Sequence, residues 1–163
     1  MAKNKEEKTN VMRVLEQKKI AYSAHTYPHE EGVAVDGVTV AQSMGFDPAI
    51  VFKTLVARGA SKQYYVFDVP VAESLDLKKA AKAVGEKSIE MLHQKELLPL
   101  TGYVHGGCSP VGMKKLFPTV FHSSAENLAA MIVSAGKIGY QVELAPHDLA
   151  ALVRAKFADI IVE

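Results

Sequence analysis

The sequence has few of the features that mark a secreted, membrane-spanning or broadly nucleic-acid-binding protein. Its single cysteine, Cys108, cannot form an internal disulfide. No apolar stretch approaches the roughly 18 residues that cross a bilayer, and residues 1–8, MAKNKEEK, contain no apolar signal core. The formal net charge is only +1, so any contact with nucleic acid has to come from a local patch. We therefore expect a cytoplasmic protein with no membrane or DNA partner.

The length and composition are sufficient for one sizeable core. The chain has 163 residues, 48% of them hydrophobic, and such a chain encloses a core without needing a disulfide or a metal. No low-complexity linker divides the sequence. We therefore predict a single domain over residues 1–163.

A glycine-rich segment at residues 106–112, GGCSPVG, is the most informative stretch, with three glycines and one proline in seven positions. Glycine allows positive φ and a close approach of a ligand to the backbone, so consecutive amide N–H groups can point into one concavity. The segment predicts a receptor for an acyl or phosphate oxygen, with residues 101–105 forming a short strand that leads into it. A purely structural turn is the alternative interpretation.

One lysine interrupts an otherwise apolar run at residues 51–57, VFKTLVA. The run predicts a buried strand. Lys53 must then either extend along the apolar surface to an edge or face a polar cavity, because an unpaired buried ammonium is costly. The presence of a glycine-rich receptor segment in the same chain favours the cavity.

The remaining pattern interleaves helices and strands, which predicts a mixed α/β fold. Further strands are expected at residues 21–27, 63–69, 88–91 and 117–121, and a hairpin at residues 130–144. Helices are expected at residues 11–18, 38–44, 74–84 and 146–157, with Ser74 capping the third and Gly45 and Gly85 ending the second and third.

These motifs together resemble the YbaK family of aminoacyl-tRNA deacylases, whose members are similar to the editing domain of bacterial prolyl-tRNA synthetases. The resemblance rests on Lys53 in its strand, on GGCSPVG at 106–112 and on SAGKIG at 134–139. It extends over nearly the whole chain, from HTYPH at 25–29 to AKFADI at 155–160. The fold that it implies is a mixed, mainly antiparallel sheet curled into a partial barrel with surrounding helices.

The resemblance also implies a set of site residues. The family's essential lysine falls on Lys53, and the loop glycines with a catalytic role fall on Gly106 and Gly107. The implied substrate-binding residues are Tyr27, Thr54, Ser109, Pro110, Ser134, Gly136 and Gly139. Several members carry aspartate where this chain has Gln141, so we transfer no charged role to that position. No metal or cofactor is implied.

The implied reaction is the removal of cysteine mischarged onto proline tRNA. Backbone N–H groups of residues 106–109 would stabilise the carbonyl oxygen as charge develops, and Lys53 would hold a phosphate or carbonyl as a point charge. Because no protein nucleophile is obvious, the resemblance implies that the thiol of the attached cysteine attacks its own ester carbonyl. The implied partners are the acceptor end of the mischarged tRNA and a prolyl-tRNA synthetase.

The sequence is compatible with two other functions, and it offers two other candidate sites. The protein could instead deacylate alanyl-tRNA(Pro), or it could be a non-catalytic module that binds an aminoacyl end or a small molecule. Cys108 as a nucleophile would need an identified base, which the three-residue spacing from His105 does not establish, so we interpret it as a small filler. His25 and His29 are not expected to bind a metal, because Pro28 prevents a helical register and no third ligand is near in sequence.

Overall fold

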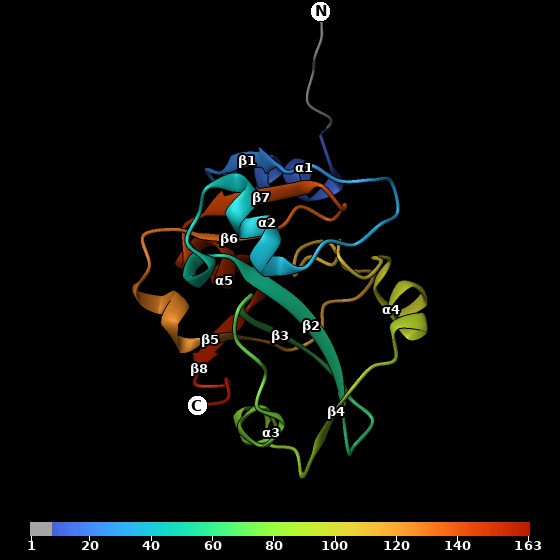
Figure 1. Cartoon of the computed structure of the whole chain (residues 1–163). Helices are drawn as coiled ribbons and strands as arrows, with labels where there is room; N and C mark the ends of the chain where they lie inside the picture. The colour runs from blue at the N-terminus through green and yellow to red at the C-terminus, as the bar shows by residue number, and fades with distance from the viewer. Residues whose placement is uncertain (1–7) are drawn as a thin grey trace, which may run out of the picture.

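Within the part of the chain that the structure describes, two β-sheets form the frame and five helices lie around them (Figure 1). The computed structural model describes residues 8–163. The larger sheet has the strand order β4-β2-β3-β5-β8 and the smaller one the order β1-β7-β6. The strands are β1 Ser23–Thr26, β2 Phe52–Gly59, β3 Tyr64–Pro70, β4 Ile89–Met91, β5 Thr119–His122, β6 Met131–Ser134, β7 Tyr140–Leu144 and β8 Ala155–Ala158. The helices are α1 Asn10–Gln17, α2 Gly37–Met44, α3 Leu77–Val84, α4 Gln94–Thr101 and α5 Pro146–Val153, with short 3-10 helices η1 Pro48–Ile50 and η2 Ser123–Asn127.

The pairing between strands is mixed and mainly antiparallel. β2 runs antiparallel to β3 and β4, and β7 runs antiparallel to β1 and β6, whereas β5 runs parallel to both β3 and β8. A bridge between Val51 and Ile132 joins the two sheets without closing them. The predicted fold class, a mixed sheet curled into a partial barrel with surrounding helices, is therefore confirmed.

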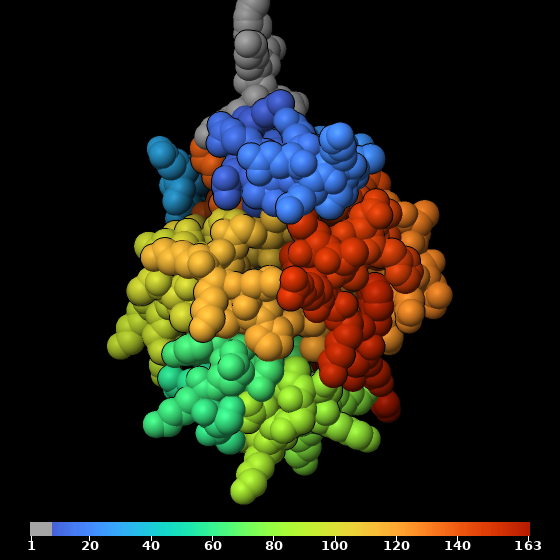
Figure 2. All heavy atoms as spheres, turned by 180° about the vertical axis from the view of Figure 1, so that it is seen from behind, coloured from blue at the N-terminus to red at the C-terminus, as the bar shows by residue number. Residues whose placement is uncertain are grey.

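The largest core cluster takes residues from both sheets and from the terminal helices. Phe52 of β2 and Phe121 of β5 pack with Met131 of β6, while Leu15 of α1 and Leu149 of α5 complete the cluster. The back of the molecule shows the same meeting of chain ends, with the N-terminal segment in blue next to the C-terminal segment in red (Figure 2). Burial of these apolar side chains is the main force that holds the two sheets together.

The predicted helix ends are correct where glycine sets them. Gly45 and Gly85 both adopt the left-handed conformation directly after α2 and α3, a geometry that glycine takes without steric cost. The predicted N-cap of α3 is wrong. Asp76 caps the helix, because its carboxylate accepts hydrogen bonds from the amides of Lys78 and Lys79, and Ser74 lies before the helix.

The sequence-based prediction of a strand at residues 101–105 is also wrong. α4 occupies Gln94–Thr101 and ends at Gly102, which has a φ of 89°. The helix was not expected because it contains Pro99, a residue that usually interrupts a helix. The glycine-rich segment at residues 106–112, called the receptor loop below, is therefore preceded by a helix end rather than by a strand.

The predicted terminal helix is too long. α5 stops at Val153 because Arg154 takes the left-handed conformation, with a φ of 58°. The next residues form β8, which pairs with β5 in parallel from Ala155 to Ala158. The apolar residues Ala155 and Phe157 thus extend the larger sheet.

None of the helices within residues 8–163 combines the length and the apolar character that a membrane span requires. The expectation drawn from the charged start of the chain concerns residues that, apart from Lys8, lie outside the described range.

Candidate active site

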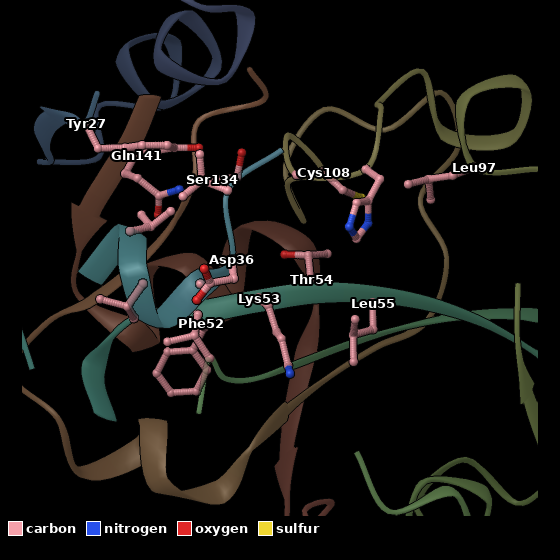
Figure 3. A pocket seen from close by; sticks show the side chains of 17 residues that line it. Tyr27, Asp36, Phe52, Lys53, Thr54, Leu55, Leu97, Cys108, Ser134 and Gln141 are labelled. Atoms are coloured by element: carbon pink, nitrogen blue, oxygen red, sulfur yellow. The ribbon is translucent and has the colours of Figure 1, made fainter. Parts of the chain in front are cut away.

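A cavity of about 300 Å³ opens where β2, the start of α2, the loop after α4 and the smaller sheet converge. Five of the predicted site residues line it together, although they come from four separate stretches of the chain. They are Tyr27, Lys53, Thr54, Gly106 and Ser134. Figure 3 shows Tyr27, Ser134 and Gln141 grouped together, with Thr54 and Cys108 on the same side of the strand β2.

Lys53 lies in β2 and lines the cavity, as the lysine in an apolar strand predicted. Its side chain is partly buried, and this burial lowers the pKa of its ammonium group, while the carboxylate of Glu73 acts in the opposite direction. Lys53 and Thr54 leave the strand on opposite sides (Figure 3), because successive strand residues alternate. The Lys53 ammonium and the Thr54 hydroxyl therefore serve different parts of the site.

Thr54 is held from behind by a buried carboxyl group. The Thr54 hydroxyl donates a hydrogen bond of 2.5 Å to Oδ1 of Asp68, which lies opposite it on β3. Asp68 is fully buried, and Oδ2 has no hydrogen-bond partner within residues 8–163. Burial raises the pKa of Asp68 to about 7, although the Thr54 hydrogen bond acts to lower it.

The glycine-rich loop offers fewer free amides than its sequence suggests. The Gly107 amide donates to the carbonyl oxygen of Val104 at 3.0 Å, so it is already committed to a turn. The amides of Gly106 and Cys108 have no such partner among the described residues, and both residues line the cavity. These two N–H groups are the ones that can receive an anionic oxygen.

Glycine is required at position 106 by its surroundings. The residue has a φ of +91°, and an added Cβ would lie 2.7 Å from the Cβ of Ala34. The positive φ and the close approach of the chain preceding α2 both exclude a larger residue without strain. Ala34 thus packs directly against the receptor loop.

Ser109 and Pro110 lie outside the cavity lining, and both are buried. The Ser109 hydroxyl accepts a hydrogen bond of 3.2 Å from the amide of Val111. The arrangement fixes the shape of the loop, in which the neighbours Gly106 and Cys108 line the cavity.

The hairpin glycines also act from behind the cavity. The Gly136 amide donates to the Ser134 hydroxyl at 3.0 Å, and the carbonyl oxygen of Gly139 accepts from the amide of Tyr27 at 3.0 Å. Both glycines have positive φ, +93° and +98°. They therefore hold the two lining residues, Ser134 and Tyr27, rather than line the cavity themselves.

Two buried polar residues of the site received no role from the sequence. Gln141 pairs with Ser134 across the hairpin, lines the cavity and is 6% exposed, and its Oε1 atom has no partner among residues 8–163. The second of these residues is Asp68. The signal that would have found it is an aspartate inside the apolar strand YYVFDVP.

Cys108 and the histidines have local explanations. Burial raises the pKa of the Cys108 thiol to about 12, with a smaller contribution from Asp68, so the side chain stays a neutral thiol near pH 7. His25 pairs with Glu143 through Nε2 and Oε1 at 2.7 Å, whereas His29 contacts the Tyr27 carbonyl through Nδ1 at 3.0 Å. The two histidines therefore point to separate partners.

The fold and the site define a mixed α/β protein with a cavity lined by a lysine and by backbone amides that have no partner among the described residues. The chain matches the model of the aminoacyl-tRNA editing domain over residues 32–152, which leaves Tyr27 outside the matched range. This protein belongs to the aminoacyl-tRNA editing domain family.

Individual relatives support the same family. A protein of Enterococcus faecalis named as the Cys-tRNA(Pro)/Cys-tRNA(Cys) deacylase EbsC is 47% identical over 161 residues, 98% of each chain. A solved structure described as a trans-editing enzyme for prolyl-tRNA synthetase has a TM-score of 0.79 at 25% identity, covering 94% of this chain and 95% of the other. Another solved structure, of a hypothetical protein, shares the fold with a TM-score of 0.82 at 18% identity, covering 93% and 99%. The predicted aminoacyl-tRNA deacylase activity is thereby confirmed, with aminoacyl-tRNA as its substrate.

Proposed function

We propose that the protein removes cysteine mischarged onto tRNA(Pro), acting in trans on the charged acceptor end. The observation that carries the proposal is the composition of the cavity lining. Lys53 and the free amides of Gly106 and Cys108 lie there together, whereas the Cys108 thiol stays protonated and is not an activated nucleophile. The E. faecalis relative, whose name gives both Cys-tRNA(Pro) and Cys-tRNA(Cys), supports cysteine as the amino acid and includes the proposed tRNA.

The chemistry follows from the available groups. The amides of Gly106 and Cys108 stabilise the carbonyl oxygen of the ester as it becomes negative, a contribution typically worth a few kcal/mol for each donor. The thiol of the attached cysteine forms a bond to its own carbonyl carbon, the ester C–O bond breaks, and the thiol proton passes to the ribose oxygen. The free tRNA leaves, and the cyclic thioester that forms is hydrolysed by water.

Lys53 and Tyr27 orient the acceptor end in this proposal. Lys53 supplies a positive charge to a phosphate or carbonyl oxygen, and Tyr27 forms part of the opposite wall. Burial raises the pKa of the Tyr27 hydroxyl, so it remains a neutral hydrogen-bonding group. We further propose that a prolyl-tRNA synthetase delivers the tRNA in the cytoplasm, because the cavity itself contacts only the charged end.

Loss of the ester bond from tRNA(Pro) charged separately with cysteine, alanine or proline tests the function. We expect rapid release of cysteine and slow release of the other two, because only cysteine carries an internal thiol nucleophile. Rapid release of alanine would require an attacking water and would replace the thiol mechanism. Binding without release of any amino acid would identify a recognition module instead of an enzyme.

A further inference from the structure

The floor of the cavity contains a buried polar pair whose hydrogen-bond direction depends on the charge of a carboxyl group. Thr54 lines the cavity, and Asp68 lies behind it on β3, fully buried and not itself part of the cavity lining. Their side chains are joined by the 2.5 Å contact between Thr54 Oγ1 and Asp68 Oδ1. An ionised carboxylate only accepts hydrogen bonds, so the threonine hydroxyl is the donor whenever Asp68 is ionised.

This direction determines what Thr54 offers to a ligand. A hydroxyl has one proton and two lone pairs. Since the proton is used inward, toward Asp68, only lone pairs remain for the cavity. Without the carboxylate the same hydroxyl could rotate and either donate or accept.

The charge around the pair favours a cationic donor. Asp68 Oδ2 has no partner among the described residues, and the pKa of Asp68 is set by burial and by the Thr54 hydrogen bond, with no contribution from a cation of residues 8–163. Lys53 leaves β2 on the side opposite Thr54 (Figure 3). When Asp68 is ionised, a negative charge that no cation of these residues neutralises therefore lies directly behind the lone pairs of Thr54, and charge-assisted hydrogen bonds are the stronger ones.

We propose that Asp68 is a positioning residue that makes Thr54 an obligate hydrogen-bond acceptor for the protonated α-amino group of the aminoacyl ester. The inference rests on the proposed deacylation of cysteinyl-tRNA(Pro) and adds how the site recognises the amino acid. Anchoring of the α-amino group orients the cysteine side chain relative to its carbonyl, which the internal attack of the thiol requires.

The acceptor role of Thr54 depends on the ionised form of Asp68. Burial raises the pKa of Asp68 to about 7, so the ionised form becomes the major one only as pH rises above neutral. A protonated Asp68 would donate to Thr54 and release the threonine proton toward the cavity. Recognition of the α-amino group should therefore weaken as Asp68 becomes protonated.

The test compares two substrates that differ only at the α-amino group. Full-length wild-type protein, Thr54→Val, Thr54→Ser and Asp68→Asn are assayed with cysteinyl-tRNA(Pro) and with 3-mercaptopropionyl-tRNA(Pro), which keeps the thiol but lacks the amine. We expect Thr54→Val and Asp68→Asn to lower kcat/KM for the cysteinyl substrate roughly tenfold, mainly through KM. The loss for the deamino substrate should be less than about twofold, and Thr54→Ser should retain the wild-type preference because it keeps the hydroxyl.

The outcomes separate this inference from the proposed function. An equal loss on both substrates would overturn the inference, because it would show either a structural role or Thr54 acting as a nucleophile with Asp68 as its base. A fall in kcat with unchanged KM would do the same. If the wild-type protein cleaves neither substrate, the proposed function fails, and the inference that rests on it falls as well. If Asp68→Asn does not fold, the comparison of Thr54→Val with Thr54→Ser still decides the question.

Discussion

Replacement of Asp68 by asparagine should make the stability of the protein less sensitive to pH. Asp68 is fully buried, and its pKa rises from 3.8 to about 7 in the folded protein. The folded state therefore binds a proton more tightly than the unfolded chain does between these two values. Because stability falls with pH wherever the folded state holds more protons, the wild-type protein loses stability as pH rises from about 4 to about 7.

The size of this effect follows from the two pKa values. The difference between 3.8 and about 7, at 1.36 kcal/mol for each pKa unit, corresponds to about 4 kcal/mol. About 2.5 kcal/mol of this loss falls between pH 5 and pH 8, where the measurement is practical. Asparagine does not titrate. The asparagine amide, one of whose groups takes the place of the unpartnered Oδ2, changes the free energy of unfolding by an amount that does not depend on pH. This amount cancels when the variant is compared with itself across pH.

The assay is urea unfolding followed by circular dichroism at several pH values between 5 and 8. We expect the free energy of unfolding of Asp68→Asn to gain on the wild type by about 2.5 kcal/mol over that range. Asp159→Asn is the control, because the Lys79 ammonium lowers the pKa of Asp159; this carboxyl group stays ionised from pH 5 to pH 8, so its replacement should leave the pH dependence over that range equal to that of the wild type. Parallel pH curves for the wild type and Asp68→Asn would show that the carboxyl group is solvated or paired in the native state, and would refute the reasoning.

Three further substitutions test the site. Lys53→Ala should lower kcat/KM for cysteinyl-tRNA(Pro) about 100-fold through loss of a charge at the substrate. The control Lys82→Ala, which replaces an exposed lysine of α3, should leave kcat/KM unchanged. Equal rates in both variants would remove Lys53 from the site. Cys108→Ala should retain deacylation within about threefold because the buried thiol stays protonated, and complete loss of activity in a folded variant would make Cys108 the nucleophile. Gly106→Ala should destabilise the protein by about 1–3 kcal/mol more than Gly45→Ala, because both have positive φ but only the first places a Cβ against Ala34; equal melting temperatures in thermal unfolding would contradict the crowding.

The local pattern predicted the elements whose signal lies within one stretch of sequence. The apolar runs gave the paired strands β2 and β3, and the hairpin of β6 and β7 followed from two apolar stretches around a glycine-containing loop. The errors occurred where tertiary structure overrides local preference. α4 forms despite Pro99, and β8 follows α5 because pairing with β5 stabilises residues whose spacing also fits a helix.

The candidate site was predicted in part for the same reason. Lys53 and the glycine loop carry their own signals, and the structure brings both to one cavity. The role of Asp68 could not be predicted in this way. Its partner Thr54 is 14 residues away in sequence, and only the register of β2 against β3 places the two side chains opposite each other.

The engaged side chains around the cavity support the proposal that the substrate supplies the nucleophile. The Thr54 hydroxyl donates to Asp68, the Ser134 hydroxyl accepts from the Gly136 amide, and the pKa of Cys108 is raised to about 12. Each of these three side chains is therefore either hydrogen-bonded to a neighbour or kept protonated. Under this proposal, a substrate that brings its own thiol needs only orientation and a receptor for the carbonyl oxygen, the roles proposed for Lys53 and for the amides of Gly106 and Cys108. Selectivity for cysteine would then follow from the reactivity of the amino acid as well as from the shape of the pocket.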